Sequence, residues 1–205
     1  NSSAQANYAW VGDVSAHRVS EDATWEMWLY PTGRGGAYID KVSTYTFKVS
    51  NGTHQWAIWG NNGSNSWAWR DTGVPARSDQ WQHVAWVKDG SNLKLYVDGQ
   101  EAYQTSAYTS IQTLPQRGNF SIQNRTSNPT EFFYGRVDEV RVWGKAKTQG
   151  QVVADMHNRP VDTTSLQAYY DFNELNSGWV RNMAPNADAN SHLRINGDLG
   201  ATDVK

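Results

Sequence analysis

Apolar and polar residues alternate in short segments along most of the chain, and clusters of Gly, Asn, Asp and Ser separate these segments. In the segment 24–30, for example, Trp25, Met27 and Leu29 fall on one face and the residues between them on the other. This alternation predicts the antiparallel strands of a β-sandwich. We expect strands over 24–30, 38–41, 45–49, 55–59, 67–70, 81–87, 93–97, 120–122, 135–143 and 166–172, with a closing strand around Leu193 and Ile195.

Tight turns join several of these segments. The pairs Asn51-Gly52, Asp89-Gly90 and Asp98-Gly99 lie between alternating runs, and such pairs favour two-residue hairpins. One short helix is expected over 148–156, where Thr148 is a candidate N-cap and apolar residues follow at helical spacing. The fold class is therefore all-β, with two antiparallel sheets and one short helix.

The length and charge of the chain limit its class. A chain of 205 residues fits one large β domain, and we expect residues 1–205 to form it. It has no cysteine, and a core of this size needs no disulfide. The net charge is −2 with both signs spread along the length, which favours neither nucleic acid nor an anionic membrane as partner. No apolar run approaches the roughly 20 residues of a membrane span, so membrane insertion is not expected.

Tryptophan and tyrosine are frequent, with 11 Trp and 10 Tyr against 5 Phe and 3 Met. Both side chains combine a large apolar face with a polar edge. They suit half-exposed positions where a ligand stacks on the ring and also forms hydrogen bonds.

Four stretches carry a resemblance to a known family. They are TWEMWL at 24–29, WQHVA at 81–85 with LYVDG at 95–99, GRVDEVRVW at 135–143 and LQAYYDF at 166–172. With these four stretches in this order, the chain resembles the laminin-G-like group of the concanavalin A-like lectin and glucanase superfamily, with pentraxins as distant relatives. The resemblance covers about residues 8–180. It implies a two-sheet jelly roll outside the cell, with ligands held on a concave face or in loops at one edge.

Catalysis is not expected. Glucanases of this fold need two carboxylates about 5 to 9 Å apart across a groove, and their Glu-x-Asp-x-x-Glu pattern is absent. Asp138 and Glu139 are adjacent on a predicted strand, where neighbours point to opposite faces, so we expect that they cannot flank one bond. His83 lies in the family motif, and we interpret it as a structural histidine.

No cofactor is required by this interpretation, although calcium is a candidate. The stretch that matches a pentraxin calcium loop is QNRTS at 123–127, which has no acid and a cation. The resemblance thus argues against calcium that bridges protein and sugar. A structural calcium with Asp138 as a ligand is possible, since related sandwiches hold one with an acid on the last strand. The alternative is that Asp138 accepts hydrogen bonds from the backbone or an arginine.

The first candidate ligand site is the predicted hairpin 55–70. Trp59 ends one strand, Trp67 and Trp69 share a face of the next, and Asn61 and Asn62 lie between. Rings offer a platform for the C–H face of a sugar, and amides both donate to and accept from its hydroxyls. The alternative is that the tryptophans pack inward under the loop.

The second candidate is the loop 123–134, with Asn124 and Arg125 near aromatic residues. It matches a position where relatives hold ligands, and Arg125 could pair with the carboxylate of an acidic sugar. The alternative is an ordinary polar loop. Tyr108 is a weaker candidate of the same kind.

These observations predict a noncatalytic, lectin-like carbohydrate-binding module of a secreted enzyme or a cell-surface adhesin, of bacterial origin. The partner is a polysaccharide or other glycan. A protein- or peptide-binding adhesion module is the alternative, and a polysaccharide hydrolase or lyase is a third.

Overall fold

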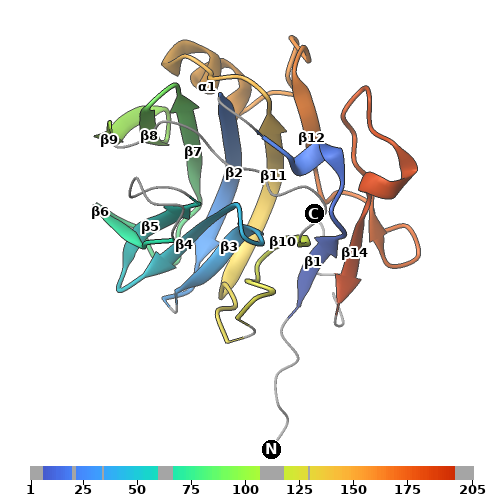
Figure 1. Cartoon of the computed structure of the whole chain (residues 1–205), viewed down its shortest axis with the longest axis horizontal. Helices are drawn as coiled ribbons and strands as arrows, with labels where there is room; N and C mark the ends of the chain where they lie inside the picture. The colour runs from blue at the N-terminus through green and yellow to red at the C-terminus, as the bar shows by residue number, and fades with distance from the viewer. Residues whose placement is uncertain are drawn as a thin grey trace, which may run out of the picture.

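The computed structural model describes residues 7–19, 22–33, 35–59, 67–106, 118–128 and 130–196. These residues form the predicted sandwich of two antiparallel sheets (Figure 1). The eight-stranded sheet has the order β13 (Trp179–Val180), β14 (Leu193–Asn196), β1 (Tyr8–Val11), β10 (Phe120–Ile122), β3 (Gly36–Lys41), β4 (Tyr45–Ser50), β5 (Thr53–Ile58) and β6 (Arg70–Pro75). The six-stranded sheet has the order β12 (Leu166–Tyr170), β11 (Gly135–Trp143), β2 (Ala23–Pro31), β7 (Gln82–Asp89), β8 (Asn92–Val97) and β9 (Gln100–Thr105).

Two predicted turns have the backbone that their residues favour. Asn51 and Gly52 have φ values of 52° and 78°, and Asp98 and Gly99 have φ values of 48° and 76°. Two consecutive positive φ values are the signature of the hairpin turn that matches strand twist. At Gly99 a Cβ would also lie 2.6 Å from the Val153 side chain, so the helix approaches this turn closely. The meander β7–β8–β9 is thereby confirmed.

The core between the sheets is rich in aromatic rings. Phe47 of β4 stacks on Trp86 of β7 at 4.8 Å between centroids, and Trp25 of β2 meets Phe47 edge-on at 5.1 Å. These rings have no exposed surface. Such offset and edge-to-face contacts add to the burial energy of each ring. The alternating apolar positions of both sheets therefore face one another.

The helix α1 (Gln149–Met156) forms where the sequence predicts it. The Thr148 hydroxyl accepts a hydrogen bond from the Gln151 amide, and the Gln151 side chain accepts one from the Thr148 amide. Val152 packs against Ala85 and Val87, so α1 covers the outer face of the six-stranded sheet. The described residues also contain two 3₁₀ turns, η1 (Ser15–His17) and η2 (Ala189–Ser191).

The prediction of a strand over 67–70 is wrong. The β6 strand starts at Arg70, which pairs with Trp56, and residues 67–69 lie outside it. The two tryptophans consequently leave the ladder, and their rings pack over neighbouring side chains. None of the helices in the described ranges has the length and apolar composition that a membrane span requires.

Candidate functional site

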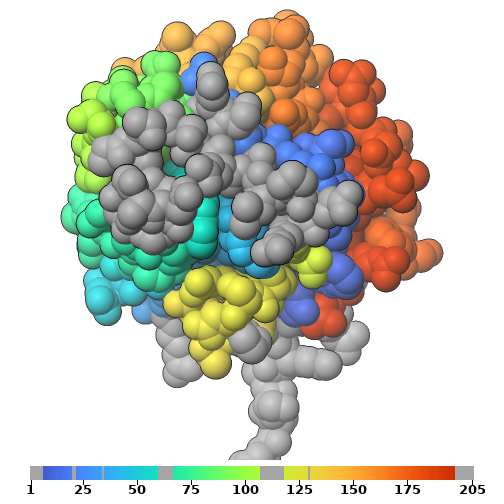
Figure 2. Space-filling model, viewed as in Figure 1, coloured from blue at the N-terminus to red at the C-terminus, as the bar shows by residue number. Residues whose placement is uncertain are grey.

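Two of the predicted loops meet on the outer face of the eight-stranded sheet. Trp67 and Trp69 precede β6, and Arg125 lies between β10 and β11. The guanidinium carbon of Arg125 is 5.7 Å from the Trp67 ring centroid and 5.2 Å from that of Trp69. The segment after β10, yellow in Figure 2, lies at the surface of the molecule. The structure therefore joins the two candidate sites into one.

Two further charged residues, Lys48 and Glu131, complete this site, which we call the tryptophan–arginine surface. The Lys48 ammonium is 3.7 Å from the Trp69 ring centroid. Glu131 pairs with both Lys48 and Arg125 at 3.0 Å. Burial opposes ionisation of Glu131, but hydrogen bonds and charges from the two cations outweigh it and lower the pKa of this carboxyl. Glu131 thus holds two cations against the indole rings.

The floor of this surface is polar and buried. Ser121, Asp40 and Thr46 lie side by side on β10, β3 and β4, on the face that points away from the core. Asp40 accepts a hydrogen bond from the Thr46 hydroxyl through Oδ1. Burial raises the pKa of Asp40 to about 7, against the effects of this bond and of the Arg125 charge.

Several buried polar atoms next to these residues have no hydrogen-bond partner within the described residues. Trp67 Nε1 and Arg125 Nε are donors, Asn124 Oδ1 is an acceptor, and Thr126 Oγ1 can be either. Buried polar atoms in proteins nearly always have a partner, so such a group indicates a place for water or a ligand. Together these atoms offer the mixture of donors and acceptors that a hydroxyl group requires.

The structure does not place the other predicted ligand residues, Trp59, Asn61, Asn62 and Tyr108, at this surface. Asn61, Asn62 and Tyr108 lie outside the described residues. Trp59 follows β5 directly and is half-buried, and its backbone N–H donates to the Thr44 carbonyl at 2.9 Å. Sequence reasoning missed Lys48 and Glu131. Lys48 could have been found, because it faces away from the core in an alternating strand, whereas nothing in the sequence marks Glu131.

An open pocket lies on the opposite side of the sandwich, over β2 and β11 beside the end of α1. We call it the helix-side pocket; its volume is about 520 Å³. It is lined by Trp28, Trp81, Asp138, Glu139, Arg141, Met156, His157, Asn158 and Arg159.

The expectation that Asp138 and Glu139 point to opposite faces is wrong. The pairing of β11 with β2 shifts register between Asp138 and Arg141, and Glu139 has a φ of 53°. A bulge of this kind breaks the alternation of side chains along a strand. Both acids therefore line the helix-side pocket. The Glu139 carboxylate is engaged there by Arg141 and by the Tyr169 hydroxyl.

Asp138, the candidate calcium ligand, accepts a hydrogen bond from the Glu139 amide at 2.8 Å. Burial raises its pKa to about 6, and the nearby charges of Glu139 and Asp171 act in the same direction. The described part of the chain contains no group of three or more metal-ligating side chains. Calcium at Asp138 stays a prediction.

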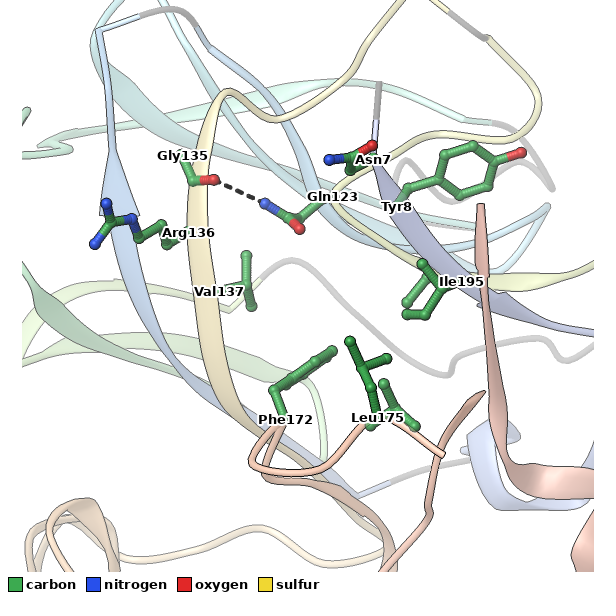
Figure 3. A pocket seen from close by; sticks show the side chains of 11 residues that line it. Asn7, Tyr8, Gln123, Gly135, Arg136, Val137, Phe172, Leu175 and Ile195 are labelled. Carbon is green, nitrogen blue, oxygen red and sulfur yellow. Dashed lines mark hydrogen bonds between the residues drawn. The ribbon is translucent and has the colours of Figure 1, made fainter. Parts of the chain in front are cut away.

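A smaller cleft is lined by residues of β1 and β11 from the two sheets (Figure 3). Val137, Phe172, Leu175 and Ile195 supply apolar lining, and the Gln123 amide, also in the lining, donates to the Gly135 carbonyl. Its volume is about 120 Å³. Ligand pockets usually measure roughly 300 to 1,000 Å³, so this cleft is too small for a sugar unit.

Comparisons with known proteins agree with this architecture. The family model described as concanavalin A-like lectin/glucanases superfamily matches residues 3–153. A protein of Bacteroides ovatus, provisionally described as carbohydrate-binding, is 16% identical with a TM-score of 0.71, over 94% of this chain and 59% of that one. The chain thus spans well under two thirds of that protein. A search of curated proteins finds no match.

Two further solved structures are similar. Domain 4 of AbnA, an extracellular arabinanase of Geobacillus stearothermophilus in complex with arabinotriose, is 19% identical with a TM-score of 0.53, over 68% of each chain. The heptameric SAP-like pentraxin of Limulus polyphemus is 15% identical with a TM-score of 0.52, over 77% of this chain and 84% of that one. At these identities the likeness shows the fold.

Proposed function

Because the chain belongs to the concanavalin A-like lectin/glucanases superfamily, we propose that it is a noncatalytic carbohydrate-binding module. We assign it to a secreted bacterial enzyme or a cell-surface adhesin, with a polysaccharide or other glycan as its ligand. The fold, which carbohydrate-binding proteins share, supports the class of ligand. The site has to be argued from its residues, since one fold hosts many functions.

The observation that carries this proposal is the tryptophan–arginine surface. Trp67 and Trp69 are half-buried, and four buried polar atoms without a partner in the described ranges lie on Trp67, Asn124, Arg125 and Thr126. A sugar presents C–H faces to rings and hydroxyls to donors and acceptors, so both halves of its chemistry are met here. Arg125 is already paired with Glu131. An acidic sugar would have to displace that carboxylate, so we favour a neutral glycan.

The absence of catalysis is part of the proposal. In the helix-side pocket the Glu139 carboxylate is bound by Arg141 and the Tyr169 hydroxyl. These two hydrogen bonds fix Glu139 in the wall of the pocket, and the Glu-x-Asp-x-x-Glu pattern of the glucanases is absent from the sequence. Asp138 is then the one acid of that pocket without a cationic hydrogen-bond partner among the described residues.

The first test is a glycan array with the isolated chain, in calcium and again in chelator. We expect selective binding of neutral glycans that chelator leaves unchanged. Loss of binding in chelator would show that calcium takes part. No binding to any glycan would overturn the proposal in favour of a protein ligand.

The second test places the site. Trp67→Ala and Trp69→Ala should each weaken binding of the array ligand by at least about 1 kcal/mol, or about fivefold in Kd by calorimetry, because a ring contact is lost. Trp179→Ala is the matched control, since Trp179 is exposed on the short strand β13. Full affinity in both the Trp67 and Trp69 variants would remove this surface as the site.

A further inference from the structure

Two indole rings border the helix-side pocket, and their neighbours hold both in place. Trp28 Nε1 donates to the Met156 carbonyl at 3.0 Å, and the Trp28 ring lies 5.3 Å from that of His157. The Trp81 ring meets Tyr30 edge-on at 5.6 Å. Rings that are fixed before binding lose little freedom when a ligand stacks on them. The pocket therefore offers preformed apolar faces.

Among the described residues, the polar side of the pocket carries both free acceptors and free donors. Oδ1 of Asp138 is used by the Glu139 amide, whereas Oδ2 has no partner within the described ranges. The Arg159 side chain is 70% exposed and contacts Asp171 through Nη2 at 3.3 Å. Its Nε and Nη1 have no partner among the residues described. A pocket that offers both acceptors and donors suits hydroxyl groups, which can donate and accept hydrogen bonds.

The size and charge of the pocket limit the class of ligand further. Its volume of about 520 Å³ lies within the range of small-ligand sites. The lining includes two acids, Asp138 and Glu139, and two arginines, Arg141 and Arg159, so the formal charges balance and favour a neutral ligand. We propose that the helix-side pocket is a second binding site of this module, for one neutral sugar unit.

This inference rests on the proposed function, because it assumes that the module binds glycans, but it assigns a separate site. The tryptophan–arginine surface lies outside the eight-stranded sheet, and the helix-side pocket lies outside the six-stranded sheet. Two sites on opposite faces cannot share one sugar unit. They hold two chains, or two distant parts of one chain, so weak single contacts are reinforced by avidity.

The experiment follows the indole N–H signals of the tryptophans by NMR, assigned with single Trp→Phe variants. The probes are arabinotriose, xylotriose and cellotriose, with trigalacturonate as the acidic comparison. We expect at least one neutral trisaccharide to shift the Trp28 and Trp81 signals in a saturable way, and trigalacturonate to leave them unchanged.

Variants separate the two sites. Trp81→Ala and Arg159→Ala should each raise the Kd measured from the Trp28 signal by about fivefold or more. Trp81→Ala removes a ring face, and Arg159→Ala removes a hydrogen bond. Both should leave the Trp67 and Trp69 signals titrating as before. Arg181→Ala, at an exposed arginine after β13, is the control for Arg159→Ala, and the exposure of Arg159 makes a folding defect in that variant unexpected.

The outcomes distinguish the two proposals. Shifts at Trp67 and Trp69 without shifts at Trp28 and Trp81 would overturn the second site and leave the proposed function standing. Shifts at Trp28 and Trp81 alone would support the pocket and move the proposed function to it. No saturable shift at Trp28 and Trp81 with any neutral trisaccharide would overturn the second site, whereas the glycan array decides the proposed function.

Discussion

The outer faces of the two sheets both carry ion pairs next to tryptophan rings, but they differ in their access to solvent. Over the eight-stranded sheet, Lys48 and Glu131 have 11% and 23% of their side chains exposed. Over the six-stranded sheet, Lys147 and Glu26 have 1% and 0%. The ion pair over the eight-stranded sheet is partly open to solvent, whereas the pair beneath α1 is closed. The first pair therefore borders the tryptophan–arginine surface, and the second fixes the helix.

The closed pair is part of a larger network. Oε1 of Glu26 accepts from Lys147 Nζ at 2.7 Å and from Trp143 Nε1 at 2.8 Å. Lys147 also contacts the Asp155 carboxylate of α1 at 2.7 Å. The Lys147 ammonium lies 4.4 Å from the Trp143 ring centroid. These contacts link the segment after β11 and the helix α1 to β2. Removing one charge therefore destabilises the attachment of both to the sheet.

The largest expected effect comes from breaking the closed pair. Glu26→Gln leaves the buried Lys147 ammonium with the partly exposed Asp155 as its remaining counter-charge, and breaking a buried ion pair costs up to about 3 to 5 kcal/mol of stability. We expect a loss of that size in the free energy of unfolding from urea denaturation.

The open pair provides the comparison. Glu131→Gln should cost about 1 kcal/mol or less, since solvent screens the partly exposed Lys48 and Arg125. Equal losses in the Glu26 and Glu131 variants would show that the two faces do not differ in the way that their exposure indicates.

The pH dependence of stability is expected to have opposite signs on the two faces. Burial lowers the pKa of His83 to about 3, and the Arg141 and Lys147 charges add to this. Burial raises the pKa of Asp40 to about 7. A histidine with a lowered pKa destabilises the fold as pH falls from about 6.5 towards 3, because the unfolded chain binds the proton first. An aspartate with a raised pKa destabilises it as pH rises from about 4 to 7.

The measurement is unfolding free energy from pH 4 to 8 for wild type, His83→Gln and Asp40→Asn. Relative to wild type, His83→Gln should gain stability as pH falls, and Asp40→Asn should gain stability as pH rises. The difference from wild type cancels His17 and His54, which are also buried with lowered pKa values. If the stability difference from wild type changed with pH in the same direction in both variants, the opposite pKa shifts of His83 and Asp40 would be contradicted.

Sequence patterns predicted the parts of this molecule that depend on local chemistry. The Asn51-Gly52 and Asp98-Gly99 turns follow from residues that tolerate positive φ, and α1 follows from the Thr148 cap. The bulge at Glu139 could not be predicted, because a non-glycine residue there adopts a positive φ only in the context of its sheet. Its consequence, two acids in one pocket, was missed for the same reason.

The candidate site was predicted by residue type but not by arrangement. Trp67, Trp69 and Arg125 were assigned to two separate loops, and the contact between them depends on long-range packing that no local pattern reveals. The strand expected over 67–70 begins only at Arg70, since packing of the two rings over Lys48 and Arg125 replaces pairing with β5. Tertiary contacts overrode the local β preference of tryptophan at this edge.

The smallest expected effect concerns the cap that begins the helix over the closed face. Thr148→Ala removes the hydroxyl that accepts from the Gln151 amide and should cost about 1 kcal/mol of unfolding free energy. Thr148→Ser keeps the hydroxyl and should cost a few tenths at most. Because α1 covers the six-stranded sheet alone, neither variant should change glycan affinity at the tryptophan–arginine surface. A change in that affinity with Thr148→Ala but not Thr148→Ser would show that the two faces are coupled through the sandwich, which their separate contacts do not predict.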